Sequence, residues 1–269
     1  CSGWKHRHKF INMLRLLIIL MIMACLPIKA KEIGIVVDIN DSEISAKYDE
    51  ETQLFIFRGI PFAKPPIGEL RWKSPVSIEP PKVIDARIFK PACMQDTYST
   101  EWYHDVIESF DQDTSMFEHV ESVSEDCLYL NIWTTSIDSS KKKPVMVWIY
   151  GGNDVGGWTY EPNYLGHHLA QKDVVVVSIP YRLNIFGFFN HPEMENQTGN
   201  FGLEDEILAL EWVKENIAQF GGDPENITLF GESAGGAHVS YHIASPLSEG
   251  LFDRGIIQSG GYNLSKPGR

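Results

Sequence analysis

The sequence lacks the features of a metal-binding or nucleic-acid-binding protein. Its 269 residues include 4 cysteines, and no two of them have the CxxC spacing of a cysteine metal site. The 23 basic residues are outnumbered by 36 acidic ones, giving a formal net charge of −13. Because phosphate binding needs an excess of Lys and Arg, nucleic acid is not an expected partner. No internal repeat, heptad pattern or low-complexity tract is present.

The N-terminal region lacks an apolar run long enough for a membrane-spanning helix. After a short basic start, Leu16–Ile28 is almost entirely apolar but shorter than the roughly 18 residues that span a bilayer. With Ala30 as a small residue at a cleavage point, residues 13–30 have the layout of a signal peptide. A signal anchor and a buried core strand are the alternatives. Residues 1–12 stay unassigned, and the folded domain is expected in 31–269.

Export places the mature protein in an oxidising compartment, either secreted or in the ER lumen. Of the cysteines, only Cys93 and Cys127 follow the expected cleavage site. Two cysteines in such a compartment most simply form one disulfide, here closing a loop of about 35 residues. The loop-entropy model gives it a stabilisation of about 3–4 kcal/mol. Two buried free thiols are the alternative. Four candidate glycosylation sites fit the same compartment, at Asn40, Asn196, Asn226 and Asn263.

Three short apolar runs predict the centre of a sheet: Val145–Tyr150, Val174–Ile179 and Ile227–Phe230. Each is rich in β-branched residues and bounded by Gly, Pro or Asp, which is typical of strands buried on both faces. Leu203–Phe220 has apolar residues at helical spacing, and Gly221-Gly222 is expected to end that helix. Strand, helix and strand in this order predict a right-handed crossover and parallel pairing.

Two further segments complete the predicted fold. Residues 33–60 alternate apolar and polar, which favours an antiparallel edge of the sheet. Residues 94–126 are polar, acidic and weakly patterned, which predicts a long surface loop held at its base by Cys93 and Cys127. The fold class is therefore α/β, with a mostly parallel central sheet and an antiparallel N-terminal edge.

The segment most informative about chemistry is Gly231–Gly235, with the sequence Gly-Glu-Ser-Ala-Gly, between the strand Ile227–Phe230 and a helical stretch from Ala237. A strand–turn–helix with this G-x-S-x-G pattern holds the serine in a strained conformation and raises its hydroxyl to the end of the sheet. The following helix directs its N-terminus at negative charge that develops there. Ser233 is therefore the candidate nucleophile, with an ordinary glycine-rich turn as the alternative.

A serine that attacks an ester carbonyl needs N–H donors for the oxyanion that forms. One donor is expected from Ala234, which follows the nucleophile. Gly151, Gly152 and Asn153 follow an earlier predicted strand, the position from which the other donors come in such folds. Glycines there let the backbone approach a substrate. A simple turn at Gly151-Gly152 is the alternative.

Further segments match one protein family in both sequence and order: Phe57–Phe62, Pro65–Gly68, Ser124–Asn131, Val147–Gly152, Tyr181-Arg182, Phe186–Phe188, Gly199–Leu203 and Phe220–Pro224. With the Ser233 turn they cover roughly residues 33–262, and on them the sequence resembles the type-B carboxylesterase/cholinesterase family of α/β-hydrolases. The resemblance implies a disulfide between Cys93 and Cys127 and Ser233 as nucleophile. It also implies oxyanion donors at Gly152, position 153 and Ala234, with no metal and no cofactor.

The sequence departs from the family pattern in two ways. Asn153 replaces the third glycine of the oxyanion loop, and Asp154 follows where an aromatic residue is usual. Asn tolerates a positive φ better than most residues, so its N–H can still point correctly, while its side chain fills space near the acyl group. The family's catalytic acid and histidine lie beyond Arg269, so the C-terminal half of the fold is expected to be missing. We expect the chain as given to be inactive without them.

No local residue is a good substitute for the missing base. His238 and His242 lie on the helix after Ser233 and are expected to point away from the turn. Glu232 adjoins the serine and is expected to form a polar wall of the pocket. His167 and His168 are expected on a helix surface.

In cholinesterases a tryptophan ten positions before the second loop cysteine binds the choline cation, and the matching residue here is Phe117. Phenylalanine is a weaker cation–π partner, which favours a general carboxylesterase; simple packing of Phe117 is the alternative. The expected activity is serine-dependent hydrolysis of a small carboxylic ester, and a non-catalytic cholinesterase-like adhesion protein is the competing hypothesis. The sequence determines neither the natural ester nor the oligomeric state.

Overall fold

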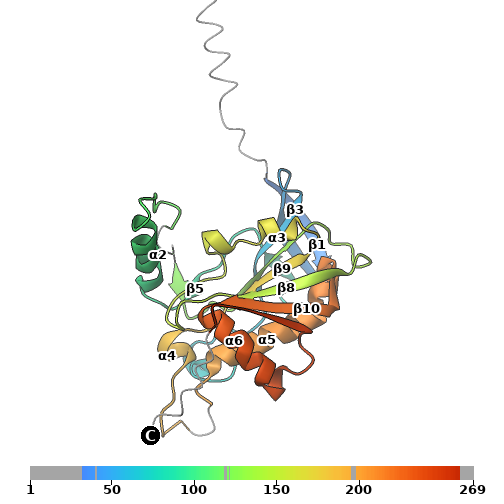
Figure 1. The fold of residues 1–269 in the computed structure, drawn as a ribbon. Helices are drawn as coiled ribbons and strands as arrows, with labels where there is room; N and C mark the ends of the chain where they lie inside the picture. The colour runs from blue at the N-terminus through green and yellow to red at the C-terminus, as the bar shows by residue number, and fades with distance from the viewer. Residues whose placement is uncertain (1–31, 40, 118–119, 121, 195–197, 261–269) are drawn as a thin grey trace, which may run out of the picture. The chain divides into compact units, whose positions relative to one another are not determined.

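A mixed nine-stranded sheet organises the chain (Figure 1), for which a computed structural model describes residues 32–39, 41–117, 120, 122–194 and 198–260. The expected signal peptide (13–30), the preceding residues 1–12 and the sequons at Asn40, Asn196 and Asn263 lie outside the described residues. Among the helices of the described part, none is both long and apolar enough to cross a bilayer.

The strands of the sheet are β1 (Glu32–Ile39), β2 (Ser42–Asp49), β3 (Leu54–Pro61), β4 (Val83–Asp85), β7 (Tyr129–Thr134), β8 (Lys143–Ile149), β9 (Val175–Ile179), β10 (Gly222–Glu232) and β11 (Arg254–Gln258). Their order is β1-β2-β3-β7-β9-β8-β10-β11, with β4 beside β2. Strands β1, β2, β3, β7 and β9 pair antiparallel in that order. Strands β9, β8, β10 and β11 pair parallel. The predicted parallel centre and antiparallel edge are confirmed, and the antiparallel part extends further, through β7.

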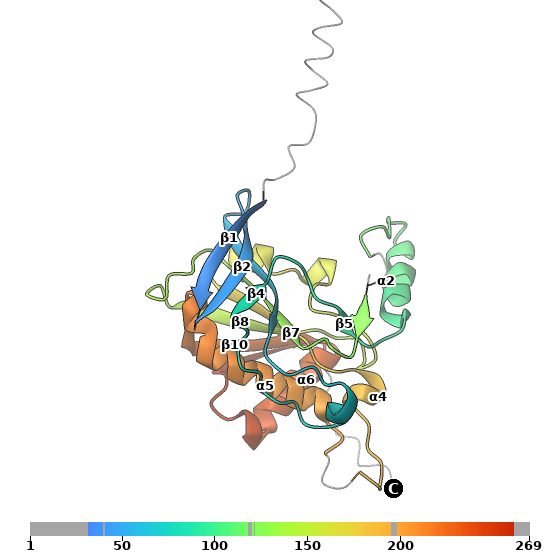
Figure 2. The same ribbon diagram turned by 180° about the vertical axis from the view of Figure 1, so that it is seen from behind.

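The helical elements are α2 (Tyr98–Glu108), α3 (His167–Ala170), α4 (Asn184–Gly187), α5 (Phe201–Asn216), α6 (Ala234–Ala244), η1 (Gly68–Leu70), η2 (Pro162–Tyr164), η3 (Ile217–Phe220) and η4 (Pro246–Ser248). Helices α5 and α6 cover one face of the sheet and α3 lies on the other (Figures 1 and 2). The helix predicted between β9 and β10 is confirmed as α5 continued by η3. Gly221, with φ of 80°, ends it in the left-handed conformation that glycine adopts most easily.

The central strands are buried on both faces because helices cover the sheet on both sides. Side chains alternate along β9, so neighbouring valines enter different clusters. Val175 and Val177 belong to the main core, which includes Leu210 of α5, whereas Val176 packs in a second cluster with Trp133 beside α3. The continuous apolar run that predicted this strand is thus explained by burial on two sides.

A disulfide joins Cys93 and Cys127, as predicted. It joins the end of β5 (Ala92–Cys93) to the chain three residues beyond β6 (Val123–Ser124), and these two short strands pair in parallel. The long surface loop predicted over residues 94–126 contains the helix α2, which the prediction did not include. Several aromatic residues of α2 border a pocket instead of the main core, so the segment lacks the apolar face of a core helix.

A buried ion pair ties the chain after β9 to α5. The carboxylate of Asp205 accepts hydrogen bonds from the backbone N–H (2.9 Å), Nε (2.8 Å) and Nη2 (2.8 Å) of Arg182. Both side chains are almost fully inaccessible to solvent. Removing water from two charges is unfavourable, so the pair depends on these hydrogen bonds to both carboxylate oxygens.

Asp205→Ala should lower the free energy of unfolding by about 3–5 kcal/mol, because it leaves the Arg182 guanidinium buried without a counterion. The control is Asp85→Ala, which removes the exposed ion pair with Arg87 and should lower it by less than about 1 kcal/mol. Urea denaturation of the purified proteins measures both values. Equal losses in the two variants would contradict the assignment of Asp205 as a buried anchor.

Candidate active site

The turn between β10 and α6 presents Ser233 at the end of the sheet. Its φ of 55° and ψ of −119° lie outside the conformations common for residues with a side chain. The N–H of Ser233 donates to the carbonyl of Gln258 in β11 (2.9 Å), and its carbonyl accepts from the N–H of Ala237 in α6 (2.9 Å). The residue is exposed to solvent, as the G-x-S-x-G pattern predicts.

The glycines on either side of the serine are required by close backbone contacts. A Cβ on Gly235 would lie 2.2 Å from the carbonyl oxygen of Ile149 at the end of β8. A Cβ on Gly231 would lie 2.5 Å from the backbone of Gly235. The tight turn can therefore form only where these two positions carry no side chain.

The segment Gly151–Asn153 follows β8 and lies against this turn. A Cβ on Gly151 would be 2.9 Å from Cβ of Ser233 and 2.8 Å from the carbonyl oxygen of Glu232. Gly152 has φ of 105° and Asn153 has φ of 55°, so Asn153 takes the left-handed conformation that its residue type tolerates. The sequence-predicted nucleophile and the candidate donor segment are thus brought together; Ala234, the other candidate, begins α6 directly after Ser233.

Side chains from two other segments hold the chain after Asn153. The side-chain amide of Gln95, just beyond the disulfide, donates to the carbonyl of Gly157 (2.7 Å) and accepts from its N–H (2.9 Å). Asn184 Nδ2 donates to the carbonyl of Val155 (2.9 Å). The segment after Asn153 is therefore hydrogen-bonded both to Gln95 near the disulfide and to Asn184 of α4.

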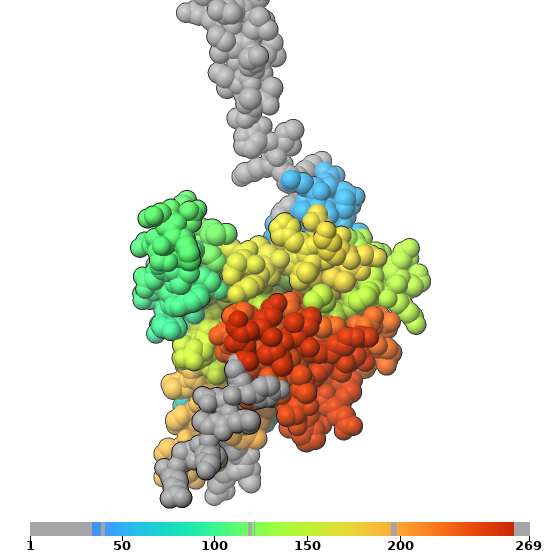
Figure 3. Space-filling view, in the orientation of Figure 1, coloured from blue at the N-terminus to red at the C-terminus, as the bar shows by residue number. Residues whose placement is uncertain are grey.

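A pocket of about 440 Å³ opens over Ser233, within the range of small-molecule sites. Gly151–Asn153 and Glu232 line one side, and Glu232 is thus the polar wall predicted from its position next to the serine. Tyr98, Trp102 and Tyr103 of α2 line the other. Figure 3 shows the hollow between the green segment that contains α2 and the yellow segment that follows Gly151–Asn153 in the chain.

Phe117 does not line this pocket. It is 3% exposed and stacks on Tyr103 with ring centroids 4.1 Å apart, so the packing alternative describes it correctly. Trp102, which is 52% exposed, is instead the indole at the pocket. Counting back from Cys127 did not identify Trp102, because α2 brings residues 98–103 to the pocket and leaves Phe117 packed behind Tyr103.

A buried carboxyl group, which the sequence analysis did not single out, forms part of the pocket wall. Glu161 accepts hydrogen bonds from the hydroxyl of Tyr103 and from the N–H of Trp158 (3.0 Å). Burial raises the pKa of Glu161 to about 7, although these hydrogen bonds oppose the shift. Burial also raises the pKa of Glu232 above its usual value. The pocket therefore has two carboxyl groups that are harder to ionise than those on the surface.

The nearby histidines are engaged elsewhere. His238 and His242 of α6 both face Glu206 of α5, at 2.8 Å and 2.7 Å, which confirms that they point away from Ser233. His168 is exposed on α3, and His167 lies beside it, half-buried. In the described part of the chain, no group of three or more His, Cys, Asp or Glu side chains is placed to hold a metal ion.

A serine at a strand–turn–helix elbow, at the carboxyl end of parallel strands in a mixed sheet, defines the α/β-hydrolase class. Residues 36–265 match the carboxylesterase family. The chain belongs to this family.

Individual relatives agree with this assignment. The chain is 45% identical over 214 residues to the medium-chain fatty acyl-CoA hydrolase precursor of Anas platyrhynchos, covering 78% of this chain and 37% of that protein. It is 42% identical over 233 residues to acetylcholinesterase of Leptinotarsa decemlineata, covering 78% and 35%. The solved structure of Geobacillus stearothermophilus carboxylesterase EST55 superposes with a TM-score of 0.72 at 41% identity, covering 85% and 44%. The chain thus spans about a third of the length of these curated relatives.

Gly235→Ala should prevent correct folding of the elbow, because the added methyl group meets the backbone of β8 and cannot move aside. We expect a loss of several kcal/mol in the free energy of unfolding, the upper end of the range for single substitutions. Gly34→Ala in β1 is the matched control, since a Cβ there has nothing within 4 Å. Chemical denaturation compares the two; similar stabilities would show that the elbow is less closely packed than described.

Glu161→Gln should change the pH dependence of stability. The raised pKa of Glu161 favours its protonated form in the folded state, so its contribution is complete below about pH 4.5 and is lost as the pH rises through about 7. Glutamine cannot ionise and can still accept from Tyr103. The stability of the variant relative to wild type should therefore increase between pH 4.5 and 7 and then level off. Thermal unfolding across this range measures it; a constant difference would contradict the shifted pKa.

Proposed function

We propose that Ser233 is the nucleophile of a carboxylic ester hydrolase that works through an acyl-enzyme. The observation that carries this proposal is the juxtaposition of an exposed elbow serine with Gly151–Asn153 at the base of one pocket. Family membership supports ester hydrolysis as the general reaction.

In the proposed reaction, Oγ of Ser233 attacks the ester carbonyl carbon and gives up its proton to a base. The resulting oxyanion accepts hydrogen bonds from the N–H groups of Gly152, Asn153 and Ala234. The C–O bond to the alcohol then breaks, and the alcohol leaves with a proton returned by the base. Water attacks the acyl-enzyme in the same way, which releases the carboxylic acid and restores the hydroxyl.

The proposed base and its acidic partner come from the protein beyond residue 269. His238 and His242 are held by Glu206, and no histidine is among the described residues that line the pocket. Residues 1–269 alone are therefore proposed to lack turnover, because a serine hydroxyl without a base is a poor nucleophile.

The proposed substrate is a small carboxylic ester, bound against the aromatic side chains of α2. Phe117 packs away from the pocket and Trp102 lines it, so the weaker cation–π contact of a phenylalanine does not decide between a general carboxylesterase and an enzyme for choline esters. The relatives include both a fatty acyl-CoA hydrolase and an acetylcholinesterase. The family therefore leaves the acyl and alcohol groups open.

The proposed location is the secretory pathway, supported by the Cys93–Cys127 disulfide. Among the candidate glycosylation sites, Asn226 is described, and its Oδ1 accepts a hydrogen bond from Arg254 Nη1 (2.6 Å). Its modification stays a prediction.

Ser233→Ala should abolish ester hydrolysis in the complete gene product, lowering kcat by about 10⁴-fold or more. Wild-type protein should react covalently with a fluorophosphonate probe, and the variant should not. Ser140→Ala is the control: this exposed serine precedes β8, at the end of the strand opposite Gly151. Labelling that is absent in wild type would refute the proposal and favour the non-catalytic adhesion hypothesis, and labelling that persists in Ser233→Ala would refute the assignment of Ser233 as nucleophile.

A further inference from the structure

The backbone directly after the proposed oxyanion donors has an unusual conformation. Asn153 and Asp154 have φ of 55° and 61°, so two consecutive non-glycine residues occupy the left-handed region. For residues with a Cβ this region is unfavourable by about 1–2 kcal/mol each. Contacts with the surrounding structure must therefore stabilise the bend.

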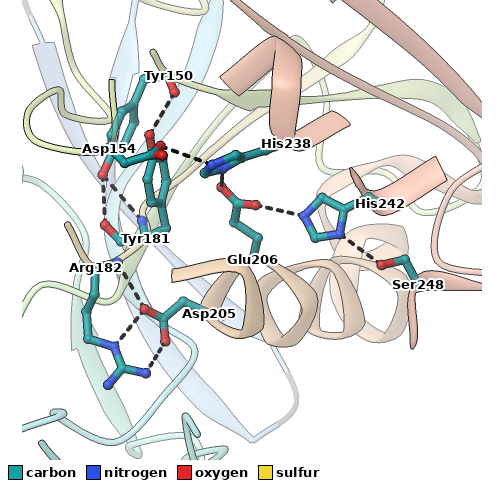
Figure 4. A network of polar contacts seen from close by, with 9 residues as sticks. All are labelled: Tyr150, Asp154, Tyr181, Arg182, Asp205, Glu206, His238, His242 and Ser248. Carbon is teal, nitrogen blue, oxygen red and sulfur yellow. Dashed lines mark hydrogen bonds and ion pairs between the residues drawn. The ribbon is translucent and has the colours of Figure 1, made fainter. Parts of the chain in front are cut away.

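One such contact is made by the side chain of Asp154. Its Oδ1 lies 3.1 Å from Nε2 of His238 (Figure 4). The His238 side chain is 2% exposed and that of Asp154 is 41% exposed, so the ion pair lies at the boundary between the protein interior and solvent. His238 is on α6, the helix that begins directly after Ser233. The pair therefore connects the oxyanion loop to the helix of the nucleophile.

The other side of the His238 ring is also fixed. Nδ1 lies 2.8 Å from Oε1 of Glu206, whose Oε2 lies 2.7 Å from Nε2 of His242 (Figure 4). Nδ1 of His242 is 2.8 Å from the hydroxyl of Ser248. The ring of Tyr181 packs edge-on against His238 with centroids 4.9 Å apart. These contacts hold the ring of His238 with its Nε2 at ion-pair distance, 3.1 Å, from Oδ1 of Asp154.

The charges in this network favour a cationic His238. Burial alone would lower the pKa of His238, but the carboxylates of Glu206 and Asp154 raise it to about 10. Burial would likewise raise the pKa of Glu206, but His238 and His242 lower it. Because Glu206 already neutralises the imidazolium, Asp154 is a second carboxylate that charge balance does not require. Because this carboxylate is on the oxyanion loop, its contact with His238 also holds the loop against α6.

The backbone of the loop is held from the opposite direction by α4. The N–H of Asn184 donates to the carbonyl of Asp154 (2.8 Å), and Asn184 Nδ2 donates to the carbonyl of Val155 (2.9 Å). Asp154 is thus held through its carbonyl by α4 and through its carboxylate by α6. Fixing both groups of one residue determines the direction of the peptide units that precede it.

We propose that Asp154 and His238 are positioning residues that hold the N–H groups of Gly152 and Asn153 towards the developing oxyanion. This inference rests on the proposed function of Ser233. Neither side chain is assigned a contact with substrate; both act through the loop backbone. A small displacement of the donors weakens hydrogen bonds that are strongest in the transition state, so it lowers kcat more than it changes substrate binding.

The test compares Asp154→Asn with Asp41→Asn in the complete gene product. Asp41 is exposed in the turn between β1 and β2 and has φ of 62°, so it undergoes the same chemical change in a similar backbone conformation, far from the pocket in the order of strands. The measurements are kcat and KM for a p-nitrophenyl ester, and the inhibition constant of a trifluoromethyl ketone. The ketone forms an oxyanion adduct with the serine and so reports on the donors directly.

Asp154→Asn should lower kcat by about 10- to 100-fold, less than the 10²–10³-fold typical of losing a donor. The affinity for the trifluoromethyl ketone should fall by a similar factor, while KM stays within about twofold. If Asp154 had a purely structural role, the variant would be less stable, but its folded form would keep the kcat and the ketone affinity of wild type. If Asp154→Asn matches Asp41→Asn in kcat and ketone affinity, the inference is wrong.

Two checks separate the possible failures. Near-UV circular dichroism tests whether each variant is folded, and Asp154→Ser, which also removes the carboxylate, replaces Asp154→Asn if that variant does not fold. A wild-type protein without esterase activity, or an active Ser233→Ala, overturns the proposed function and this inference with it. An active wild type whose Asp154 variants retain full kcat overturns this inference alone.

Discussion

The close approach of the end of β8 to the turn after β10 is the constraint on which the rest of the site depends. The two strands are parallel neighbours, with Gly231 paired to Ile149. The residues that follow them therefore leave the sheet side by side. Because Gly235 packs on the carbonyl of Ile149, α6 begins close to the sheet and Ser233 is forced into its unusual backbone conformation. The nucleophile and its candidate donors meet without any element between them.

Helix α5 contributes to this arrangement through two adjacent acidic residues. Successive residues on a helix point about 100° apart, so Asp205 and Glu206 reach different partners. Asp205 pairs with Arg182 after β9, and Glu206 pairs with His238 on α6. The two carboxylates are completely buried on a helix that also packs on the apolar core. One turn of α5 thereby fixes both the chain that leaves β9 and the helix that follows the elbow.

Most of the central sheet could be predicted from the sequence because its signals are local. The strand at Val174–Ile179 is marked by an uninterrupted apolar run, and the end of the next helix is marked by a glycine pair. Both signals involve only residues that are close together in the chain. The elbow was predictable for the same reason, since its glycines and serine are contiguous. Contacts between distant segments have no such local pattern. Asp154 and His238 each stood out in the sequence for a separate reason, but no pattern predicted that they form a pair or that Glu206 joins them.

The side of the pocket formed by α2 was the least predictable part of the site. Spacing from a cysteine identified Phe117, because counting assumes a fixed loop length. In the structure Phe117 packs against Tyr103, and the tryptophan that lines the pocket is Trp102 of α2. The aromatic residues of this helix are exposed or half-buried at the pocket, so they give no core-like periodicity.

The disulfide closes the segment that contains α2 into a loop separate from the strands of the main sheet. The helix lies between Cys93 and Cys127, and none of the described residues between them belongs to a strand of the main sheet. Substitutions in α2 can therefore reshape the rim of the cavity while the register of β8 and β10 stays the same. Gln95 lies between the same two cysteines but holds Gly157, so the closed loop combines a rim that shapes selectivity with an anchor for the chain beside the nucleophile.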